Sequence, residues 1–405
     1  MSGYLDQESG QEESSAIELL EQMIQEAMKV QGSDIHLEPL DSNNTRIRIR
    51  RDGFLYTAMN LDFLIGQRVI SRLKVLSGLN IAEKRLPQDG RFSVQLEGQP
   101  SVDMRVSTCP VRLGEKVVLR LQNTRETCLE LFELGFEQES LNLLHSALSK
   151  SQGMILVTGP TGSGKTLTLY SALQQLNIIS KNICTVEDPI EMPLKGVMQV
   201  QIQPKINLNF ATVLSAFLRQ DPDIIMVGEI RDIETAEIGI KAAQTGHLVL
   251  STLHTNNALE TLTRLSGMGI PRYAIASSVS LVIAQRLVRR LCVDCKQIES
   301  DKFIHELVCD RLKSLGVSPE KLSQAKLFKS NPMGCNQCHQ GFRGRTGCFE
   351  VIPITEDLKN LILQGANILE MQAYCEKQNY WNLWNAGVSK ILNGETTLEE
   401  IAGVI

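Results

Sequence analysis

Two kinds of hydrophobic periodicity mark the first third of the chain. Apolar residues recur at helical spacing in two segments, whereas in two others apolar and polar side chains alternate as they do in half-buried strands. The helical segments are 16–30 and 62–79, and the alternating segments are 45–59 and 91–122. The pair Asp52-Gly53 is a hairpin turn signal. We therefore predict a small α+β domain over residues 16–127, after a polar segment, 1–15, that we expect to be disordered.

From residue 128 onward, short apolar strands alternate with helical patterns. We expect strands at 154–157, 182–186, 223–227 and 247–252, and helices at 165–177, 209–219 and 232–244. This alternation is typical of a parallel sheet with crossover helices. Residues 256–291 are predicted to be mostly helical, and a helical tail is expected from Glu356 to the end. The second domain is thus an α/β domain over residues 128–405.

Composition limits the classes of function. The chain has 405 residues, 42% hydrophobic and 21% charged, with a formal net charge of −5. These values are typical of a globular protein of two or three domains. The negative charge disfavours nucleic acid as a partner, because nonspecific binding needs Lys and Arg to neutralise phosphates. We find no signal peptide and no apolar run of the ~20 residues that a spanning helix needs. We expect a cytoplasmic protein that attaches peripherally to the inner membrane through partners.

One motif indicates a phosphate site. The sequence GPTGSGKT after the strand at 154–157 fits the P-loop pattern in full, and its residues are Gly159, Pro160, Thr161, Gly162, Ser163, Gly164, Lys165 and Thr166. Glycines let the backbone N–H groups turn inward, and the following helix N-terminus favours an anion. Lys165 should reach the β- and γ-phosphates, and the Thr166 hydroxyl should bind Mg²⁺. We therefore predict ATP and Mg²⁺ as ligands.

Acidic residues at two strand ends add to this site. Glu187 follows the strand at 182–186, and Glu229 follows the strand at 223–227. In parallel sheets, ligands bind outside the carboxyl ends of the strands. One carboxylate can hold Mg²⁺ through water, and another can orient the attacking water. We assign the second role to Glu229, whereas Asp221 and Asp223 precede their strand and are expected to be structural.

Histidines flank the strand at 248–253. His247 precedes it and His254 follows it. Single histidines are more often structural than catalytic. Because these two bracket a strand of the same sheet, we expect at least one of them to sense the γ-phosphate.

Paired cysteines indicate a metal site in an excursion at 292–348. Two Cys-x-x-Cys pairs supply Cys292, Cys295, Cys335 and Cys338. Such pairs place two thiolates on one tetrahedral Zn²⁺, and four protein ligands with no open position make the site structural. His339 and Cys348 are nearby substitutes that we rank below the pairs. The alternative is four reduced thiols without metal.

Four of these elements in order resemble a known family. They are GPTGSGKTLTLY (159–170), TVEDPIE (185–191), RQDPDIIMVGEIRD (219–232) and AAQTGHLVLSTLHTN (242–256). They are similar to the Walker A, Asp box, Walker B and His box of the ATPases of type II secretion and type IV pilus assembly, the GspE/PilB type. GSDIHLEP (32–39) and LPQDGR (86–91) resemble the signature of the family's second N-terminal domain, and GCNQCHQGFRGRTGCFE (334–350) its metal-binding region. The resemblance covers about residues 16–405.

The resemblance implies a fold, an assembly and residue roles. The fold is a RecA-like motor domain preceded by a PAS-like α+β domain, assembled as a homo-hexamer beside an inner-membrane platform protein. It makes Glu229 the catalytic glutamate, gives Glu187 the metal or its water, and places His254, with His247, on the γ-phosphate side. Two further residues, Arg105 and Arg120, correspond to arginines that the N-terminal domain brings over the nucleotide. Without the resemblance, both would be ordinary arginines extending from a strand.

The chain departs from the family pattern in two places. Leu167 stands where the family usually has Thr, and we expect little effect. Long members carry a further N-terminal domain that docks on the platform, whereas this chain begins almost directly at the second domain. We therefore expect a short pilus-type or accessory member that docks differently.

The leading function is ATP hydrolysis that extrudes a pilus or pseudopilus, and the runner-up within this class is DNA uptake through a competence pseudopilus. A RecA-type DNA helicase is disfavoured by the acidic charge and by the arginine-bearing N-terminal domain. A catalytically dead assembly subunit would lack Lys165 or Glu229, and both are present. Retraction ATPases generally lack the metal region, so a retraction role is also disfavoured.

Overall fold

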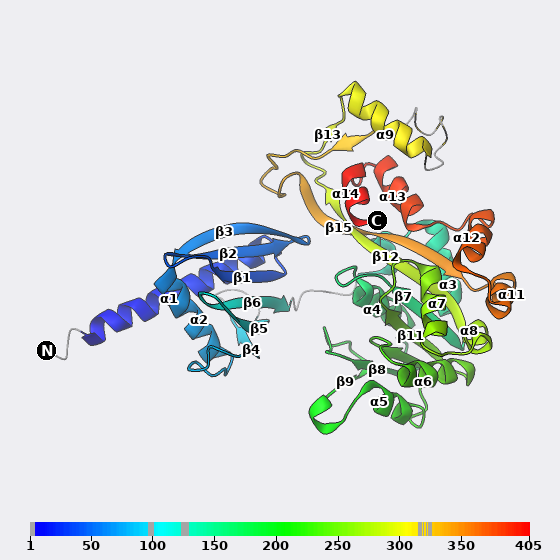
Figure 1. The fold of residues 1–405 in the computed structure, drawn as a ribbon, viewed down its shortest axis with the longest axis horizontal. Coiled ribbons are helices and arrows are strands. Elements are labelled where there is room, and N and C mark those ends of the chain that lie inside the picture. Colours follow the sequence, from blue (N-terminus) through cyan, green and yellow to red (C-terminus); the bar gives the residue numbers. More distant parts are fainter. Residues whose placement is uncertain are drawn as a thin grey trace. The chain divides into compact units, whose positions relative to one another are not determined.

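The structure is a computed structural model that describes residues 5–95, 101–122, 129–314 and 326–405, with Ser318, Glu320 and Leu322. It divides the chain into two compact units, Met1–Thr127 and Cys128–Ile405. Figure 1 labels most of the helices and strands of both units.

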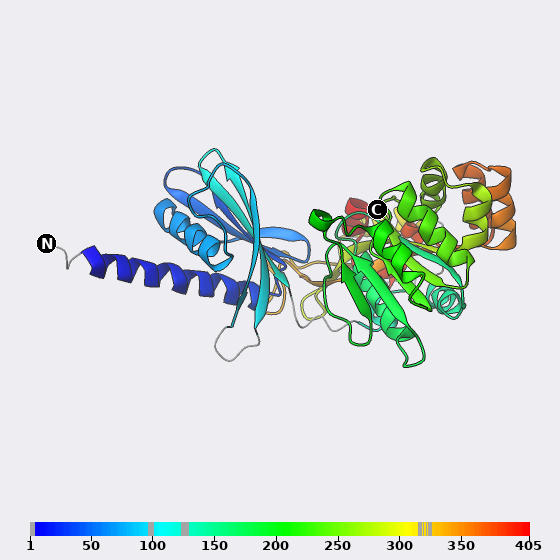
Figure 2. The same cartoon turned by 90° about the horizontal axis from the view of Figure 1, so that it is seen from below.

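The first unit is an antiparallel sheet with two helices on one face (Figure 2). Its six strands follow the order β3-β2-β1-β6-β5-β4. The elements are α1 (Leu5–Lys29), β1 (Asp34–Pro39), β2 (Asn44–Arg51), β3 (Phe54–Asp62), α2 (Phe63–Leu76), β4 (Gln88–Val94), β5 (Val102–Val111) and β6 (Gly114–Gln122). The predicted hairpin is present between β2 and β3, where Asp52 and Gly53 both have positive φ, as a type I′ turn requires.

Apolar and polar side chains alternate along the strands, and this alternation decides which face of the sheet the two helices cover. Apolar side chains of the strands, such as Ile35 and Met104, pack against α1 and α2 in one buried cluster. The intervening positions carry charged side chains on the other face. One expectation is wrong for this unit, because α1 begins at Leu5 and residues 5–15 are therefore helical. Glu, Gln and Leu in this segment are good helix formers, and the helix continues without a break into its buried part. Residues 1–4 lie outside the described residues.

The second unit is built on a seven-stranded sheet with the order β15-β12-β7-β11-β10-β8-β9. Its strands are β7 (Gly153–Thr158), β8 (Ile183–Glu187), β9 (Met198–Gln201), β10 (Ile224–Val227), β11 (Leu248–Leu253), β12 (Val279–Leu291) and β15 (Phe342–Pro353). All neighbouring pairs are parallel except β12 and β15. The predicted strands and helices of the βαβ pattern are therefore confirmed within one or two residues of their ends.

Helices cover both faces of this sheet, so its central strands are buried on both sides as expected for parallel strands, whereas the edge strand β9 is partly exposed. One face packs against η1 (Leu131–Leu134), α3 (Gln138–Leu148) and α4 (Lys165–Leu176). The other packs against α5 (Phe210–Phe217), α6 (Ile233–Gln244), α7 (Ala258–Gly267), α8 (Arg272–Ser278), α11 (Glu356–Gln364) and α12 (Ile368–Lys377). A further turn, η2 (Pro204–Ile206), follows β9.

The strand β12 corrects the prediction that residues 256–291 are mostly helical. Only α7 and α8 are helical there, and 279–291 form a strand. Leu281 and Ile283 face one core, whereas Val282 and Ala284 face the other. An apolar run that is buried on both sides carries no periodicity that separates strand from helix. The strand is defined by its distant partners, β7 on one side and β15 on the other.

The cysteine excursion and the end of the chain pack together. The excursion contains β13 (Gln297–Ile298), α9 (Lys302–Ser314) and β14 (Phe328–Lys329), and the chain ends with α13 (Leu383–Leu392) and α14 (Leu398–Val404). Leu312 of α9 shares a buried cluster with Ile391 and Ile401. The predicted helical tail is confirmed. None of the helices in the described ranges combines the length and the hydropathy that crossing a bilayer requires.

Candidate nucleotide and metal sites

The phosphate loop joins the end of β7 to the start of α4. Three of its residues, Gly159, Gly162 and Gly164, have positive φ, a conformation that side chains disfavour. A Cβ atom on Gly159 would lie 2.5 Å from the main-chain oxygen of Gln285. The glycines are therefore needed both for the turn and for the close approach of β12. The first N–H groups of α4 follow directly, which makes the loop a site for an anion.

The cation of this loop is Lys165. Its Nζ donates to the main-chain oxygens of Gly159 (2.7 Å) and Pro160 (3.1 Å), and the residue is 9% exposed. Burial lowers its pKa to about 8, although the charge of Glu229 acts in the opposite direction. Thr166 is exposed in the first turn of α4. The loop thus holds a buried ammonium group next to a hydroxyl that solvent reaches.

Glu229 lies at the same edge of the sheet, just beyond the carboxyl end of β10. Its Oε2 is 3.6 Å from His254 Nε2, and its Oε1 accepts a hydrogen bond from Arg231 (2.5 Å). Burial favours the neutral carboxyl, but the hydrogen bond from Arg231 and the charges of Arg231, His254 and Lys165 hold the pKa of Glu229 below its usual value. Glu229 is therefore an ionised acceptor at neutral pH, beside a histidine whose pKa is lowered by burial and by Lys165.

Glu187 is buried, and its carboxylate is hydrogen-bonded by neighbouring side chains. It ends β8, is 3% exposed, and accepts hydrogen bonds from Thr185 Oγ1 (2.5 Å), Gln199 Nε2 (3.1 Å) and the hydroxyl of Tyr170. Both of its oxygens are therefore engaged by neighbouring side chains. This network fixes Glu187 between β8, β9 and α4. Its support of a metal or a metal-bound water remains a prediction.

The two histidines lie at opposite ends of β11. His254 follows the strand at the edge where the phosphate loop lies. His247 precedes the strand, where its main-chain oxygen accepts from the N–H of Gly153 at the start of β7 (3.1 Å) and its Nδ1 lies 3.0 Å from the Ala242 oxygen. Parallel strands place these ends on opposite edges of the sheet. Within this unit His247 therefore does not lie with His254 beside the phosphate loop, and its contacts hold the turn before β11.

Asp223 also lies at the edge away from the phosphate loop. Its carboxylate accepts from Lys181 Nζ (3.0 Å) and from the N–H of Asn182 (2.8 Å). The expectation that it is structural fits these contacts.

Two residues of β12 belong to the site and were not predicted. Gln285 donates to the main-chain oxygen of Ser163 (2.5 Å) and accepts from the hydroxyl of Thr168 (2.9 Å), so it braces the phosphate loop. Arg286 donates to the main-chain oxygens of Gln285 (3.1 Å) and Asn256 (2.9 Å). No motif marks them in the sequence. Recognising 279–291 as a strand beside β7 would have placed them there.

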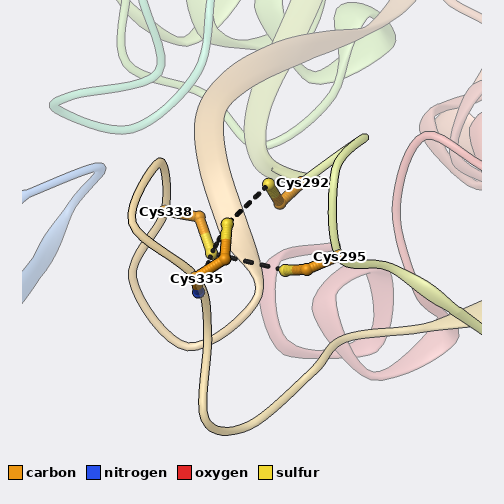
Figure 3. Close-up of side chains that lie close together, drawn as sticks. All are labelled: Cys292, Cys295, Cys335 and Cys338. Carbon is orange, nitrogen blue, oxygen red and sulfur yellow. Dashed lines mark hydrogen bonds between the residues drawn. The ribbon is translucent and has the colours of Figure 1, made fainter.

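The four predicted cysteines gather in one place (Figure 3). Their sulfur atoms all lie within 4.8 Å of one another, and the nearest pairs are 3.5 to 3.7 Å apart. Four thiolates around a tetrahedral Zn²⁺ at about 2.3 Å would be roughly 3.8 Å apart. The donor set therefore fits zinc. Cys348, one of the weighed substitutes, is fully buried in a hydrophobic cluster away from this group.

Comparison with known proteins gives the family. Residues 9–403 match the family described as "Type II/IV secretion system protein". The chain belongs to this family. It is 47% identical over 393 residues to the "Type IV pilus assembly ATPase PilB" of Acinetobacter baylyi, covering 96% of this chain and 66% of the relative. It is 43% identical over 396 residues to the "Type II secretion system ATPase E" of Vibrio cholerae, covering 97% of this chain and 76% of the relative.

Solved structures show that the fold of this chain is known from other proteins. The ATPase DotB of Legionella pneumophila aligns with a TM-score of 0.68 at 22% identity, covering 95% of this chain and 94% of DotB. The pilus retraction motor PilT, solved with bound ADP, aligns with a TM-score of 0.60 at 25% identity, covering 95% and 96% of the two chains. The predicted resemblance to the GspE/PilB type is confirmed. The chain spans about two thirds of the length of the Acinetobacter relative.

The two arginines that the family resemblance singled out lie in the first unit. Arg105 on β5 and Arg120 on β6 are directly opposite each other in the ladder, on the face away from α1 and α2. Arg120 donates through Nε to Asp34 Oδ1 (2.9 Å), and its side chain is 63% exposed. The two residues occupy neighbouring strands. One conformational change of this unit would therefore move both together.

Proposed function

We propose that this chain hydrolyses ATP and is the motor that powers assembly of a type IV pilus or of the pseudopilus of type II secretion. One observation carries the proposal. A complete phosphate loop with a buried Lys165 lies at the same sheet edge as Glu229, an ionised carboxylate 3.6 Å from His254. The names of the relatives, ATPases of pilus assembly and of type II secretion, support the class of machine.

Each residue has a chemical task in this proposal. The loop N–H groups and Lys165 bind the β- and γ-phosphates, and the Thr166 hydroxyl holds Mg²⁺, which would neutralise charge on the phosphate oxygens. Glu229 orients the attacking water, because it is the ionised acceptor next to the loop. His254 faces Glu229 from the neighbouring strand and contacts the γ-phosphate side.

We further propose the assembly that the family resemblance implies. Unit Cys128–Ile405 is a RecA-like motor domain, and unit Met1–Thr127 is a PAS-like domain. Six chains form a ring in the cytoplasm that acts on a platform protein of the inner membrane. The parallel sheet with its phosphate loop after β7 supports the first assignment. The tetracysteine group favours assembly over retraction.

The first prediction for the nucleotide site is that removing the Lys165 side chain weakens ATP binding. We expect Lys165→Ala to weaken ATP affinity about 10- to 100-fold, the effect of losing one charge-assisted contact of roughly 1.5–3 kcal/mol. Binding of a fluorescent ATP analogue to the full chain measures this. The matched control is Lys181→Ala, whose partner is Asp223 at the far edge of the sheet. Equal affinity in Lys165→Ala and the unmodified chain would contradict the nucleotide site.

We also propose that Cys292, Cys295, Cys335 and Cys338 hold one structural Zn²⁺ per chain. We expect Cys335→Ser to release the metal and to lower the melting temperature of the second unit, because binding of a structural zinc is itself folding free energy. Metal analysis and thermal unfolding measure the two effects. The control is Cys309→Ser, a cysteine of the same excursion outside the group. Protein that was purified without chelator and contains no zinc would refute the site.

A further inference from the structure

We propose that Arg286 is a positioning residue for hydrolysis, because it ties the loop that carries His254 to the strand that braces the phosphate loop. The inference rests on the proposed function and goes beyond it. No motif of the sequence includes Arg286.

The contacts of Arg286 are two main-chain oxygens from distant parts of the chain. Nη1 donates to the oxygen of Gln285 (3.1 Å), and Nη2 donates to the oxygen of Asn256 (2.9 Å). The residue is 8% exposed, so these bonds are largely shielded from water. Its charge is also near enough to Lys165 to lower the pKa of that ammonium group, although less than burial does. Arg286 therefore lies beside the phosphate loop.

Each accepting oxygen belongs to a segment with a task in the site. Gln285 contacts the phosphate loop with its side chain, and its main-chain oxygen is the atom that leaves no room for a Cβ on Gly159. Asn256 lies two residues after His254, which faces Glu229. Arg286 consequently sets the distance between the loop that holds the phosphates and the histidine beside the catalytic carboxylate.

A second anchor holds the other end of the same loop. Glu350 of β15, which is 7% exposed, accepts from the N–H of Ala258 at the first residue of α7 (3.1 Å). The segment between β11 and α7 is thus fixed at Asn256 by Arg286 and at Ala258 by Glu350. Both side chains come from neighbouring strands, β12 and β15, at positions that alternation turns toward α7.

The geometry requires arginine rather than any cation. A guanidinium group presents several N–H donors in a planar fork, so it can bond two oxygens in different directions. A lysine would keep the positive charge near the phosphates but has a single nitrogen on a flexible stem. Arg286→Lys therefore separates the effect of position from the effect of charge.

The experiment compares turnover and ATP affinity of Arg286→Lys with those of the unmodified full chain. We expect kcat to fall on the order of 100-fold, the cost of displacing a catalytic group by about 1 Å, and ATP affinity to change little. The matched control is Arg289→Lys, on the same strand, whose guanidinium bonds the carboxylate of Glu400 instead. We expect the control to keep its turnover. Full turnover in Arg286→Lys would overturn the inference.

A double-mutant cycle with His254→Ala tests whether Arg286 acts through His254. If Arg286 acts by placing His254, Arg286→Lys should add little loss in the His254→Ala background. Two independent losses that multiply, or a His254→Ala variant with full turnover, would overturn the inference.

A readout that does not use activity separates the inference from the proposed function. The chain has six histidines, so the ring NMR signal of His254 can be assigned with His254→Ala. It should shift in Arg286→Lys and stay in place in Arg289→Lys. An unmodified chain that binds ATP without hydrolysing it would contradict the proposed function, and an unmoved His254 signal would contradict the positioning role.

Discussion

Glu229→Gln should bind ATP as the unmodified chain does and lose turnover by about 10²- to 10⁴-fold, the usual contribution of a positioned acid or base. Glutamine keeps the shape of the side chain and one acceptor oxygen, but it has no charge with which to orient and deprotonate water. Loss of kcat at unchanged affinity is the signature of an interaction made only in the transition state. Steady-state hydrolysis and nucleotide binding on the same preparation measure the two quantities.

The control for Glu229 is Asp223→Asn. Asp223 lies at the other end of β10 and is bonded to Lys181 and to the N–H of Asn182. We expect this variant to keep its turnover. If Glu229→Gln keeps its turnover as well, the water is oriented by another carboxylate. Glu187 is then the next candidate, although its oxygens are already hydrogen-bonded.

Arg105→Ala and Arg120→Ala should each lower turnover far more than affinity, by up to the roughly 10³- to 10⁵-fold that an arginine finger contributes in related phosphoryl transfers. Lys165 covers one side of the triphosphate, whereas charge in the transition state spreads over three equatorial oxygens. The bond from Arg120 to Asp34 uses Nε, and the side chain is otherwise largely exposed. Hydrolysis would then depend on the movement of the first unit, which is what a motor needs.

The control for the two arginines is Arg46→Ala, in the same sheet. Arg46 on β2 forms an ion pair with Glu38 on β1 at 3.0 Å. This pair lies away from the position where Arg105 and Arg120 face each other between β5 and β6. We expect it to hydrolyse ATP at the normal rate. Normal turnover in both Arg105→Ala and Arg120→Ala would make the first unit a passive adaptor.

The sequence by itself determined the features that depend on neighbouring residues. The phosphate loop, the turn at Asp52-Gly53 and the two Cys-x-x-Cys pairs are local patterns, and each has the predicted conformation or grouping in the structure. The strand-helix alternation around Glu229 was also readable, because parallel strands repeat one order of elements. The sequence also implied where the two histidines lie, because residues that precede and follow one strand must lie at opposite edges of the sheet.

Only the tertiary structure decided the features that depend on partners far along the chain. Residues 279–291 are a strand because β7 and β15 bond to them, and their apolar run alone fits a buried helix equally well. The roles of Gln285 and Arg286 follow from that pairing, which places them beside the phosphate loop and the loop after His254. Likewise, the carboxylate of Glu187 accepts hydrogen bonds from Gln199 and Tyr170, and only the folded sheet and α4 bring these two residues to it. Burial and hydrogen bonding between distant segments therefore determined what motif spacing could not.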